Sequence, residues 1–154
     1  MPGTPFTIRS ANAADGERLR EIAAAAKGHW GYPPSRVQAW AAAYDFSAGA
    51  LDGREVMVAV ADGRPVAWAG LLPPVDGVAL LDDLWVEPAS MGGGVGRTLF
   101  QEAARRAGEL GAVSMEWETE PNAAGFYERM GGRRVGERVS EWGRPLAVMS
   151  VSVR

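Results

Sequence analysis

Residues 80–110 of the chain read LLDDLWVEPASMGGGVGRTLFQEAARRAGEL. An apolar stretch typical of a strand runs to Val86, a turn follows at Pro88, and a helix begins after the glycines. Glycines at the start of a helix expose backbone N–H groups beside the positive end of the helix dipole, and such groups bind phosphate oxygens. The stretch therefore predicts a strand, a diphosphate-binding turn and a helix in succession.

The spacing of these glycines differs from two common phosphate motifs. No frame within residues 92–99 gives G-x-G-x-x-G, the fingerprint of dinucleotide-binding folds. The P-loop is also excluded, because no Gly-Lys-Ser/Thr follows and the only lysine in the chain is Lys27. The remaining pattern is G-x-G-x-G followed by Arg97 and Thr98. It is consistent with a phosphate-binding turn, and a flexible connection between strand and helix would also explain it.

Composition limits the chain to one domain and a few classes of function. The 154 residues are 47% hydrophobic, enough for one sizeable core in a single domain over residues 1–154. A formal net charge of −3 argues against a nucleic-acid partner and suits neutral or cationic small substrates. The chain has no cysteine and a single histidine, so we expect neither disulfides, nor a cysteine nucleophile, nor a metal site.

The start of the chain and its apolar runs bear on localisation. Residues 1–5, MPGTP, lack the charged and apolar regions of a signal peptide. No apolar run approaches the roughly twenty residues that span a membrane. We therefore expect a cytoplasmic protein with no membrane partner.

Periodicity and turn residues predict alternating strands and helices. Asn12 and Asp15 form a capping box before a first helix, a second helix follows Pro33-Pro34 through residue 44, and Asp62-Gly63 predicts a hairpin. Strands are expected at 6–9, 55–61, 65–72, 78–86, 113–119, 134–140 and 145–153, and the other helices at 12–28, 95–110 and 122–130. Central hairpins with helical crossovers imply an α/β or α+β arrangement, in which helices cover a mixed sheet.

Two motifs connect this pattern to a known family. They are the strand end Leu84-Trp85-Val86-Glu87-Pro88 with the glycine run to Gly96, and Pro121-Asn122-Ala123-Ala124-Gly125-Phe126-Tyr127-Glu128-Arg129-Met130-Gly131. Both resemble the GNAT superfamily of acyl-CoA-dependent N-acetyltransferases, and the resemblance covers nearly the whole chain. It implies a GNAT-like fold, with a mixed, mostly antiparallel sheet of about seven strands flanked by about four helices. It also implies transfer of an acetyl group from acetyl-CoA to a primary amine by direct attack in a ternary complex.

The resemblance assigns coenzyme contacts to two segments and two side chains. In this family the strand at Leu84, Trp85 and Val86 separates from its neighbour, and its backbone pairs with the pantetheine arm; ordinary strand core is the plainer interpretation. Pyrophosphate contacts fall to Met91, Gly92, Gly93, Gly94, Val95, Gly96, Arg97 and Thr98. Asn122 and Phe126 match further coenzyme contacts, although helix capping and core packing would equally account for them.

Two positions depart from the family pattern. Met91 stands where arginine or glutamine is usual, so one side-chain donor to the pyrophosphate is missing. Gly132 stands where an aromatic residue commonly follows, which is expected to loosen the packing there. Together they leave room for weak coenzyme affinity. Met91 and the open choice of the general base motivate an alternative function, a non-catalytic acyl-CoA sensor or interaction module, and a nucleotide-phosphate enzyme is a third hypothesis.

Acetyl transfer needs a neutral amine, a stabilised oxyanion and a proton for the departing thiolate. Tyr127 matches the family's tyrosine, and a phenol of pKa about 10 stays protonated at pH 7 and donates to a thiolate whose thiol lies near 8.5. A tyrosine packed between helix and sheet is the alternative. Candidate bases are Glu118, ranked first because it lies near a strand end, Asp83 on the adjacent strand, and Glu116. Each of these, taken singly, is explained more simply as a surface carboxylate.

Residues 29–33 read HWGYP and join the first two expected helices. The run resembles a sequence in a subset of small bacterial GNAT proteins, where this connection overhangs the acceptor. We expect Trp30 and Tyr32 to form an aromatic wall for an apolar or cationic acceptor, and His29 to relay a proton. A loop anchored into the core by its aromatic side chains is the alternative. The expected partners are a small-molecule or peptide amine and, through the closing strands, a second copy in a homodimer.

Overall fold

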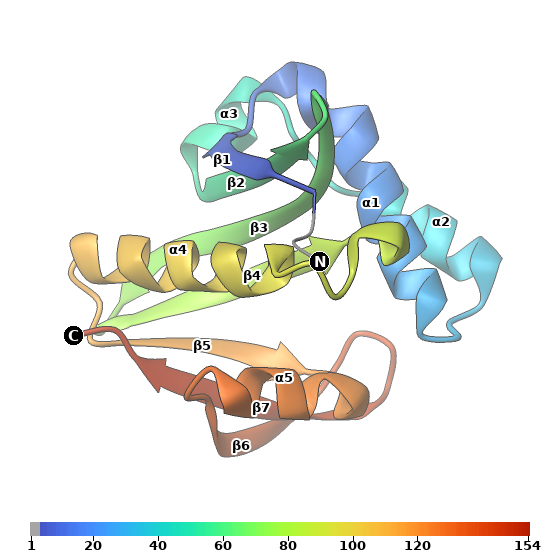
Figure 1. The fold of residues 1–154 in the computed structure, drawn as a ribbon. Coiled ribbons are helices and arrows are strands. Elements are labelled where there is room, and N and C mark those ends of the chain that lie inside the picture. The colour runs from blue at the N-terminus through green and yellow to red at the C-terminus, as the bar shows by residue number, and fades with distance from the viewer. Residues whose placement is uncertain (1–3) are drawn as a thin grey trace.

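The computed structural model describes residues 4–154, so the first three residues of the segment 1–5 lie outside it (Figure 1). The described chain forms a sheet of seven strands in the order β1-β2-β3-β4-β5-β7-β6, in which only the β4–β5 pair is parallel. The strands are β1 (Phe6–Ser10), β2 (Glu55–Ala61), β3 (Arg64–Val75), β4 (Val78–Val86), β5 (Ser114–Thr119), β6 (Arg133–Val139) and β7 (Pro145–Ser152). This mixed, mostly antiparallel sheet confirms the fold class expected from the sequence.

Within residues 4–154, five α-helices cover the two faces of the sheet (Figure 1). They are α1 (Gly16–His29), α2 (Pro34–Ala42), α3 (Ala48–Asp52), α4 (Val95–Glu109) and α5 (Ala124–Arg129). The helices α4 and α5 pack on one face around Leu99 and Trp117, whereas α1, α2 and α3 cover the other around Ile22 and Trp68. None of these helices is long and apolar enough to cross a membrane.

Local signals explain several element boundaries. The capping box is confirmed: the Ala14 amide donates to the Asn12 side chain at 3.0 Å, and the Asn12 amide donates to Asp15 at 2.9 Å. Asp62 and Gly63 form the expected hairpin turn with φ values of 52° and 73°, as a type I′ turn requires. β2 and β4 have their expected bounds, and the other strand ends differ by at most three residues.

Two expectations about helices need correction. The prediction that Gly28 ends the first helix is wrong, because α1 continues to His29 and the chain leaves the helix at Gly31, where φ is +89°. The helix α3 was not expected, since five residues are too few to show a helical period; Ser47 caps it by accepting a hydrogen bond from the Ala50 amide at 3.4 Å. The expected helix 122–130 begins with a short 3₁₀ turn, so its α-helical part is only six residues.

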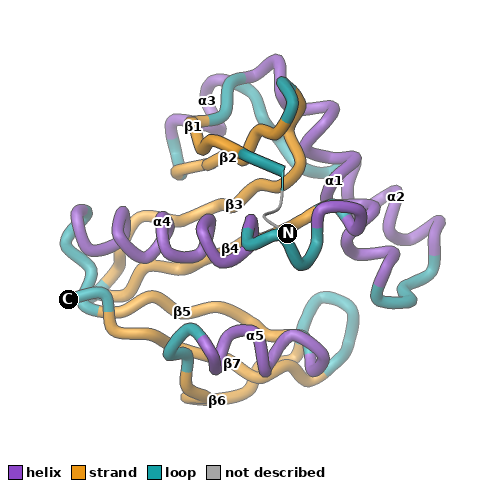
Figure 2. Tube along the Cα trace, in the orientation of Figure 1, coloured by secondary structure: helices purple, strands orange, loops and turns teal. Residues whose placement is uncertain are grey.

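The parallel pairing of β4 with β5 is short. Val78–Leu80 of β4 lie opposite Ser114–Glu116 of β5, and beyond that point the strands move apart (Figure 2). Each strand stays paired on its other edge, β4 with β3 and β5 with β7. The carboxyl-terminal halves of β4 and β5 therefore face one another without pairing, as expected for residues 84–86.

Candidate active site

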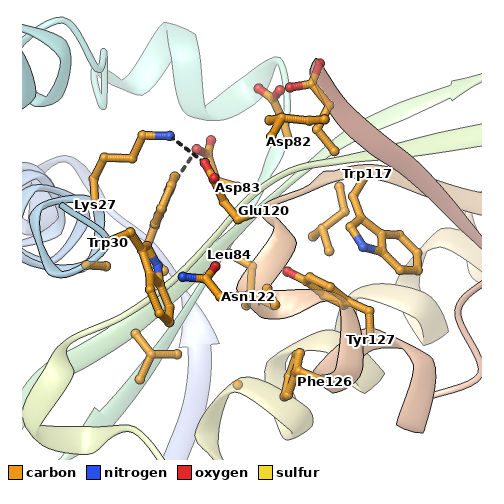
Figure 3. Close-up of a pocket in the computed structure, with 18 of the residues that line it drawn as sticks. Lys27, Trp30, Asp82, Asp83, Leu84, Trp117, Glu120, Asn122, Phe126 and Tyr127 are labelled. Carbon is orange, nitrogen blue, oxygen red and sulfur yellow. Dashed lines mark hydrogen bonds and ion pairs between the residues drawn. The ribbon is translucent and has the colours of Figure 1, made fainter. Parts of the chain in front are cut away.

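A cavity of about 670 Å³ lies where β4 and β5 diverge (Figure 3). The start of α4 and the helix α5 border one side of it, while the end of α1, the helix α2 and the loop between β6 and β7 border the other. Most of the expected site residues line it, namely Trp30, Asp83, Leu84, Trp85, Val86, Met91, Gly92, Gly94, Gly96, Arg97, Glu118, Asn122, Phe126 and Tyr127. Five others lie outside its lining, namely His29, Tyr32, Gly93, Val95 and Thr98.

The first turn of α4 presents backbone donors to this cavity. The amide and the hydroxyl of Thr98 both donate to the Gly94 carbonyl at 3.0 Å, so the amides of residues 95–97 have no acceptor within the helix. Gly92 and Gly94 have φ values of +85° and +84°, and no atom lies within 4 Å of the place where a Cβ would stand. The turn is therefore an open row of N–H donors at the positive end of a 15-residue helix, an arrangement that fits a diphosphate.

Two members of the glycine run have packing roles. Val95 is buried in the core, so its side chain points away from the cavity. Gly96 lies against Val86 and Phe126, where an added Cβ would stand 3.4 Å and 3.5 Å from their nearest carbons. These are ordinary van der Waals distances, so α4 packs against β4 and α5 here without requiring glycine. Met91 is 37% exposed beside this turn and has no hydrogen-bond donor on its side chain.

Tyr127 lies on α5 with its ring between Phe100 and Trp117, whose ring centroids are 5.8 Å and 5.0 Å away. Its hydroxyl points into the cavity, and no residue of the described chain pairs with it (Figure 3). Burial raises the pKa of the Tyr127 phenol above its ordinary value of about 10. The ring is thus a packed core residue, while its O–H group is a protonated donor open to the cavity.

Leu84, Trp85 and Val86 use their side chains for packing and leave backbone on one edge unpaired. Leu84 and Val86 contact the core beneath α4, whereas Trp85 lies on the opposite face with the α1 and α2 residues. Their backbone pairs with β3 alone, because β5 has already diverged. This segment therefore offers main-chain groups to a ligand without disturbing the sheet.

Asp83 is the centre of a buried polar network. Arg54 Nη1 donates to Asp83 Oδ2 at 2.7 Å, Trp85 Nε1 donates to Oδ1 at 2.9 Å, and the Tyr44 hydroxyl also donates to Oδ1. Burial raises the pKa of the Asp83 carboxyl, and these three hydrogen bonds act in the opposite direction. The simpler interpretation as a surface carboxylate is wrong for Asp83, since the residue is buried. Its occupied oxygens favour a role in fixing Tyr44 and Trp85.

Glu118 lies on β5 at the cavity and is the more accessible carboxylate. Its side chain is 36% exposed, and Arg138 Nη1 lies 3.4 Å from its Oε1. Glu116, two residues earlier, does not line the cavity and lies in the short segment where β5 pairs with β4.

Among the described residues, no group of three or more histidine, cysteine, aspartate or glutamate side chains is arranged to hold a metal ion.

Glu120 is a cavity residue that sequence reasoning missed. Its Oε1 accepts hydrogen bonds from Lys27 Nζ at 3.2 Å and from the Tyr32 hydroxyl at 2.7 Å, and Arg144 Nη1 lies 3.7 Å from its Oε2. Glu120 thereby ties α1, the connection after α1 and the β6–β7 loop together. The alternation that selected Glu118 also includes Glu120, but the following Pro121 makes it resemble a turn residue.

The HWGYP connection is partly an anchor and partly a wall. Tyr32 is buried, donates to Glu120, accepts from Arg144 at 2.9 Å, and does not line the cavity. Burial and the neighbouring Glu120 charge raise the pKa of Tyr32 to about 12. Trp30 lines the cavity, with the ring of His29 against it at a centroid distance of 4.9 Å.

The aromatic wall is larger than the sequence indicated. Trp40 of α2 and Trp142 of the β6–β7 loop also line the cavity, and the Trp40 ring lies 5.1 Å from that of Trp85 and 6.2 Å from that of Trp142. Trp40 Nε1 donates to Glu141 Oε1 at 3.1 Å, which joins the loop to the helix. The sequence could not indicate this wall, because its members come from three distant segments.

Comparisons with known proteins agree with this architecture. No curated protein matches the chain. The GCN5-related N-acetyltransferase of Rhodopseudomonas palustris is similar in structure with a TM-score of 0.82 and 26% identity, covering 99% of this chain and 98% of that one. The PaiA N-acetyltransferase of Thermoplasma acidophilum, in complex with coenzyme A, gives 0.77 with 18% identity over 96% and 99%. The yncA protein of Salmonella typhimurium, with its cofactor acetyl-CoA, gives 0.71 with 22% identity over 98% and 95%.

The sequence itself carries the family signal. A model of the Acetyltransferase (GNAT) family matches residues 17–132, which include parts of both sides of the cavity: the start of α4 and the helix α5 on one, and the end of α1 and the helix α2 on the other. That match spans well over half of the chain. The chain therefore belongs to the GNAT acetyltransferase family.

Proposed function

We propose that this protein transfers an acetyl group from acetyl-CoA to a primary amine, which attacks the thioester directly in a ternary complex. One observation carries the proposal: the unpartnered Tyr127 hydroxyl opens into the cavity between the diverging strands, which also reaches the donor-rich start of α4. A coenzyme held by its diphosphate at one end of this cavity could extend its pantetheine arm so that the sulfur meets the phenol, which would protonate the leaving thiolate.

The coenzyme site is proposed from the donors along one side of the cavity. Amides of residues 95–97 and the open glycines 92 and 94 would hold the pyrophosphate, with Arg97 adding a charge-assisted contact. Backbone of residues 84–86 would pair with the pantetheine arm. The crystallised relatives from Thermoplasma acidophilum and Salmonella typhimurium hold coenzyme A and acetyl-CoA and have the same fold, which supports this proposal.

Tyr127 is proposed as the general acid. Its pKa is raised by burial, so the phenol stays protonated at neutral pH and gives its proton to sulfur as the carbon–sulfur bond breaks. The amine must lose protons in the same reaction. Glu118 is proposed to accept one, directly or through water, since it lines the cavity from β5, is far more exposed than Asp83, and has a single, long ion pair.

The acceptor site is proposed on the opposite side of the divergence, beneath the wall formed by Trp30, Trp40, Trp85 and Trp142. Indole faces attract cations and pack against apolar groups. Asp83 would act here as a positioning residue, because its hydrogen bonds fix Tyr44 and Trp85.

The test is release of free thiol from acetyl-CoA against a panel of primary amines. Tyr127→Phe is expected to lower kcat about a hundredfold, because it removes a general acid, while coenzyme A binding measured by calorimetry stays unchanged. Tyr32→Phe is the matched control, since it removes a phenol that does not line the cavity. Tight coenzyme binding with no turnover on any amine would instead favour the sensor alternative, and ATP or NAD bound far better than coenzyme A would favour a nucleotide enzyme.

A further inference from the structure

The chain contains one lysine, and the structure places its side chain inside the cavity. Lys27 lies in the last turn of α1, is 6% exposed, and extends across the cavity toward the end of β5 (Figure 3). A lysine confined in this way differs from the usual surface lysine, which extends into solvent.

The surroundings of Lys27 Nζ have the chemistry of a site for an amine. Nζ lies 4.3 Å from the ring centroid of Tyr32, and 5.1 Å, 5.5 Å and 5.6 Å from the rings of Trp142, Trp40 and Trp85. Glu120 Oε1 accepts its hydrogen bond at 3.2 Å. Aromatic faces together with one carboxylate are what binds a free ammonium ligand.

We propose that Lys27 is an acetyl acceptor of this protein's own active site, so that the enzyme acetylates itself at Nζ. The inference rests on the proposed function. Lys27 and Tyr127 line the same cavity from opposite sides, and Nζ lies 5.6 Å from the ring centroid of Trp85, whose backbone belongs to the β4 segment assigned to the acyl carrier. A carboxylate able to remove the proton from Nζ, Glu120, is already in contact with it.

The chemistry balances with groups that are present or named. The ammonium gives a proton to Glu120, Nζ attacks the thioester carbonyl carbon, a nitrogen–carbon bond forms and the carbon–sulfur bond breaks with its electron pair on sulfur. Tyr127 protonates the thiolate. Nζ loses two protons in all: one replaces the proton given by Tyr127 and the other leaves through Glu120 to water. The products are Nε-acetyl-lysine and free coenzyme A.

The modification would change the acceptor side of the cavity. An amide carries no charge, so it forms neither the ion pair with Glu120 nor the cation–π contacts with the four rings. The added acetyl group also occupies space beneath the indole wall. Acetylated protein is therefore expected to turn over external amines more slowly than unmodified protein.

The experiment uses the full chain with acetyl-CoA and no added acceptor, followed by intact-protein mass spectrometry and peptide mapping. We expect the mass of one acetyl group per chain, mapped to Lys27, and none at this position in Lys27→Arg, which keeps the positive charge. Tyr127→Phe is expected to slow the reaction about a hundredfold, and saturating coenzyme A to suppress it. Urea-unfolded chain with the same acetyl-CoA measures the uncatalysed background.

The outcomes separate this inference from the function on which it rests. If external amines are turned over while Lys27 stays unmodified, self-acetylation is refuted and the proposed function stands. Equal modification of the folded chain, the Tyr127→Phe variant and the unfolded chain also refutes it, because the reaction is then uncatalysed. Failure of both amine turnover and Lys27 modification refutes the proposed function and this inference together.

Discussion

Replacing Arg54 by methionine is expected to be among the most destabilising changes near the cavity. Arg54 Nη1 lies 2.7 Å from Asp83 Oδ2, and the Asp83 side chain is only 3% exposed. The pair lies directly over Gly70, where an added Cβ would come within 2.6 Å of Arg54 Nη1. Methionine keeps much of the side-chain volume but leaves the Asp83 carboxylate without its counter-charge.

The size of the effect follows from what Asp83 loses and retains. Removing one partner of a buried ion pair costs about 3–5 kcal/mol. Asp83 keeps its hydrogen bonds from Tyr44 and Trp85, so we expect a loss near the lower limit, about 3 kcal/mol at neutral pH. For a chain of this size that loss lowers Tm by about 6–12 °C.

The pH dependence of this loss has a definite sign. Burial raises the pKa of Asp83 above its ordinary value of 3.8, and Arg54 acts to lower it, so Arg54→Met raises it further. Between the ordinary value and the raised one the native state binds more protons than the unfolded state, and stability falls as pH increases through that window. The penalty of Arg54→Met is therefore small at acidic pH, where Asp83 is protonated, and complete at neutral pH.

Urea unfolding of Arg54→Met at about pH 4.5 and pH 7.5 measures both quantities. Arg105→Met is the matched control, because it breaks exposed pairs with Glu102 and Glu109 and should cost far less than Arg54→Met. Adding Asp83→Asn to Arg54→Met should recover part of the loss by removing the unpaired charge. The reasoning fails if Arg54→Met costs no more than the control, or if its cost increases toward acidic pH.

Two further predictions concern the coenzyme side and the acid. Gly94→Ala should weaken coenzyme A binding, measured by calorimetry, about tenfold. The reason is that a residue with a Cβ costs about 1–2 kcal/mol at φ of +84°, so without ligand the open turn relaxes out of the binding conformation. Gly96→Ala, whose Cβ meets only ordinary contacts, should change the affinity far less, and equal effects of the two substitutions would contradict this account. The pH–rate profile of the wild type should show no loss of kcat attributable to Tyr127 up to about pH 10, since burial raises that pKa; a fall below pH 9 that disappears in Tyr127→Phe would contradict it.

The fold could be predicted because its signals are local. The hairpin at Asp62-Gly63 and the capping box at Asn12 each depend on residues within one turn of chain, and both have the expected geometry. The exception at Gly132 is instructive. A residue smaller than the family's usual aromatic was expected to loosen packing, but an added Cβ there would lie 3.0 Å from Trp117 Cζ2 and 2.9 Å from the Tyr127 carbonyl oxygen. The expectation was wrong because Trp117, on β5, already lies against this position.

The two sides of the cavity also differ in whether they depend on neighbouring residues or on residues far apart in the sequence. The coenzyme side is built from a strand, a turn and a helix that follow one another, so the glycine spacing already indicated it. On the acceptor side, Lys27, Glu120 and Trp142 meet although about ninety and twenty residues separate them along the chain, and they meet only because β4 and β5 diverge. Glu120 has the same side chain and strand alternation as Glu118, and the difference between them is the buried ammonium opposite Glu120. Charge pairing across a gap in the sheet has no periodicity in the sequence, so the acceptor chemistry of this chain had to come from its three-dimensional structure.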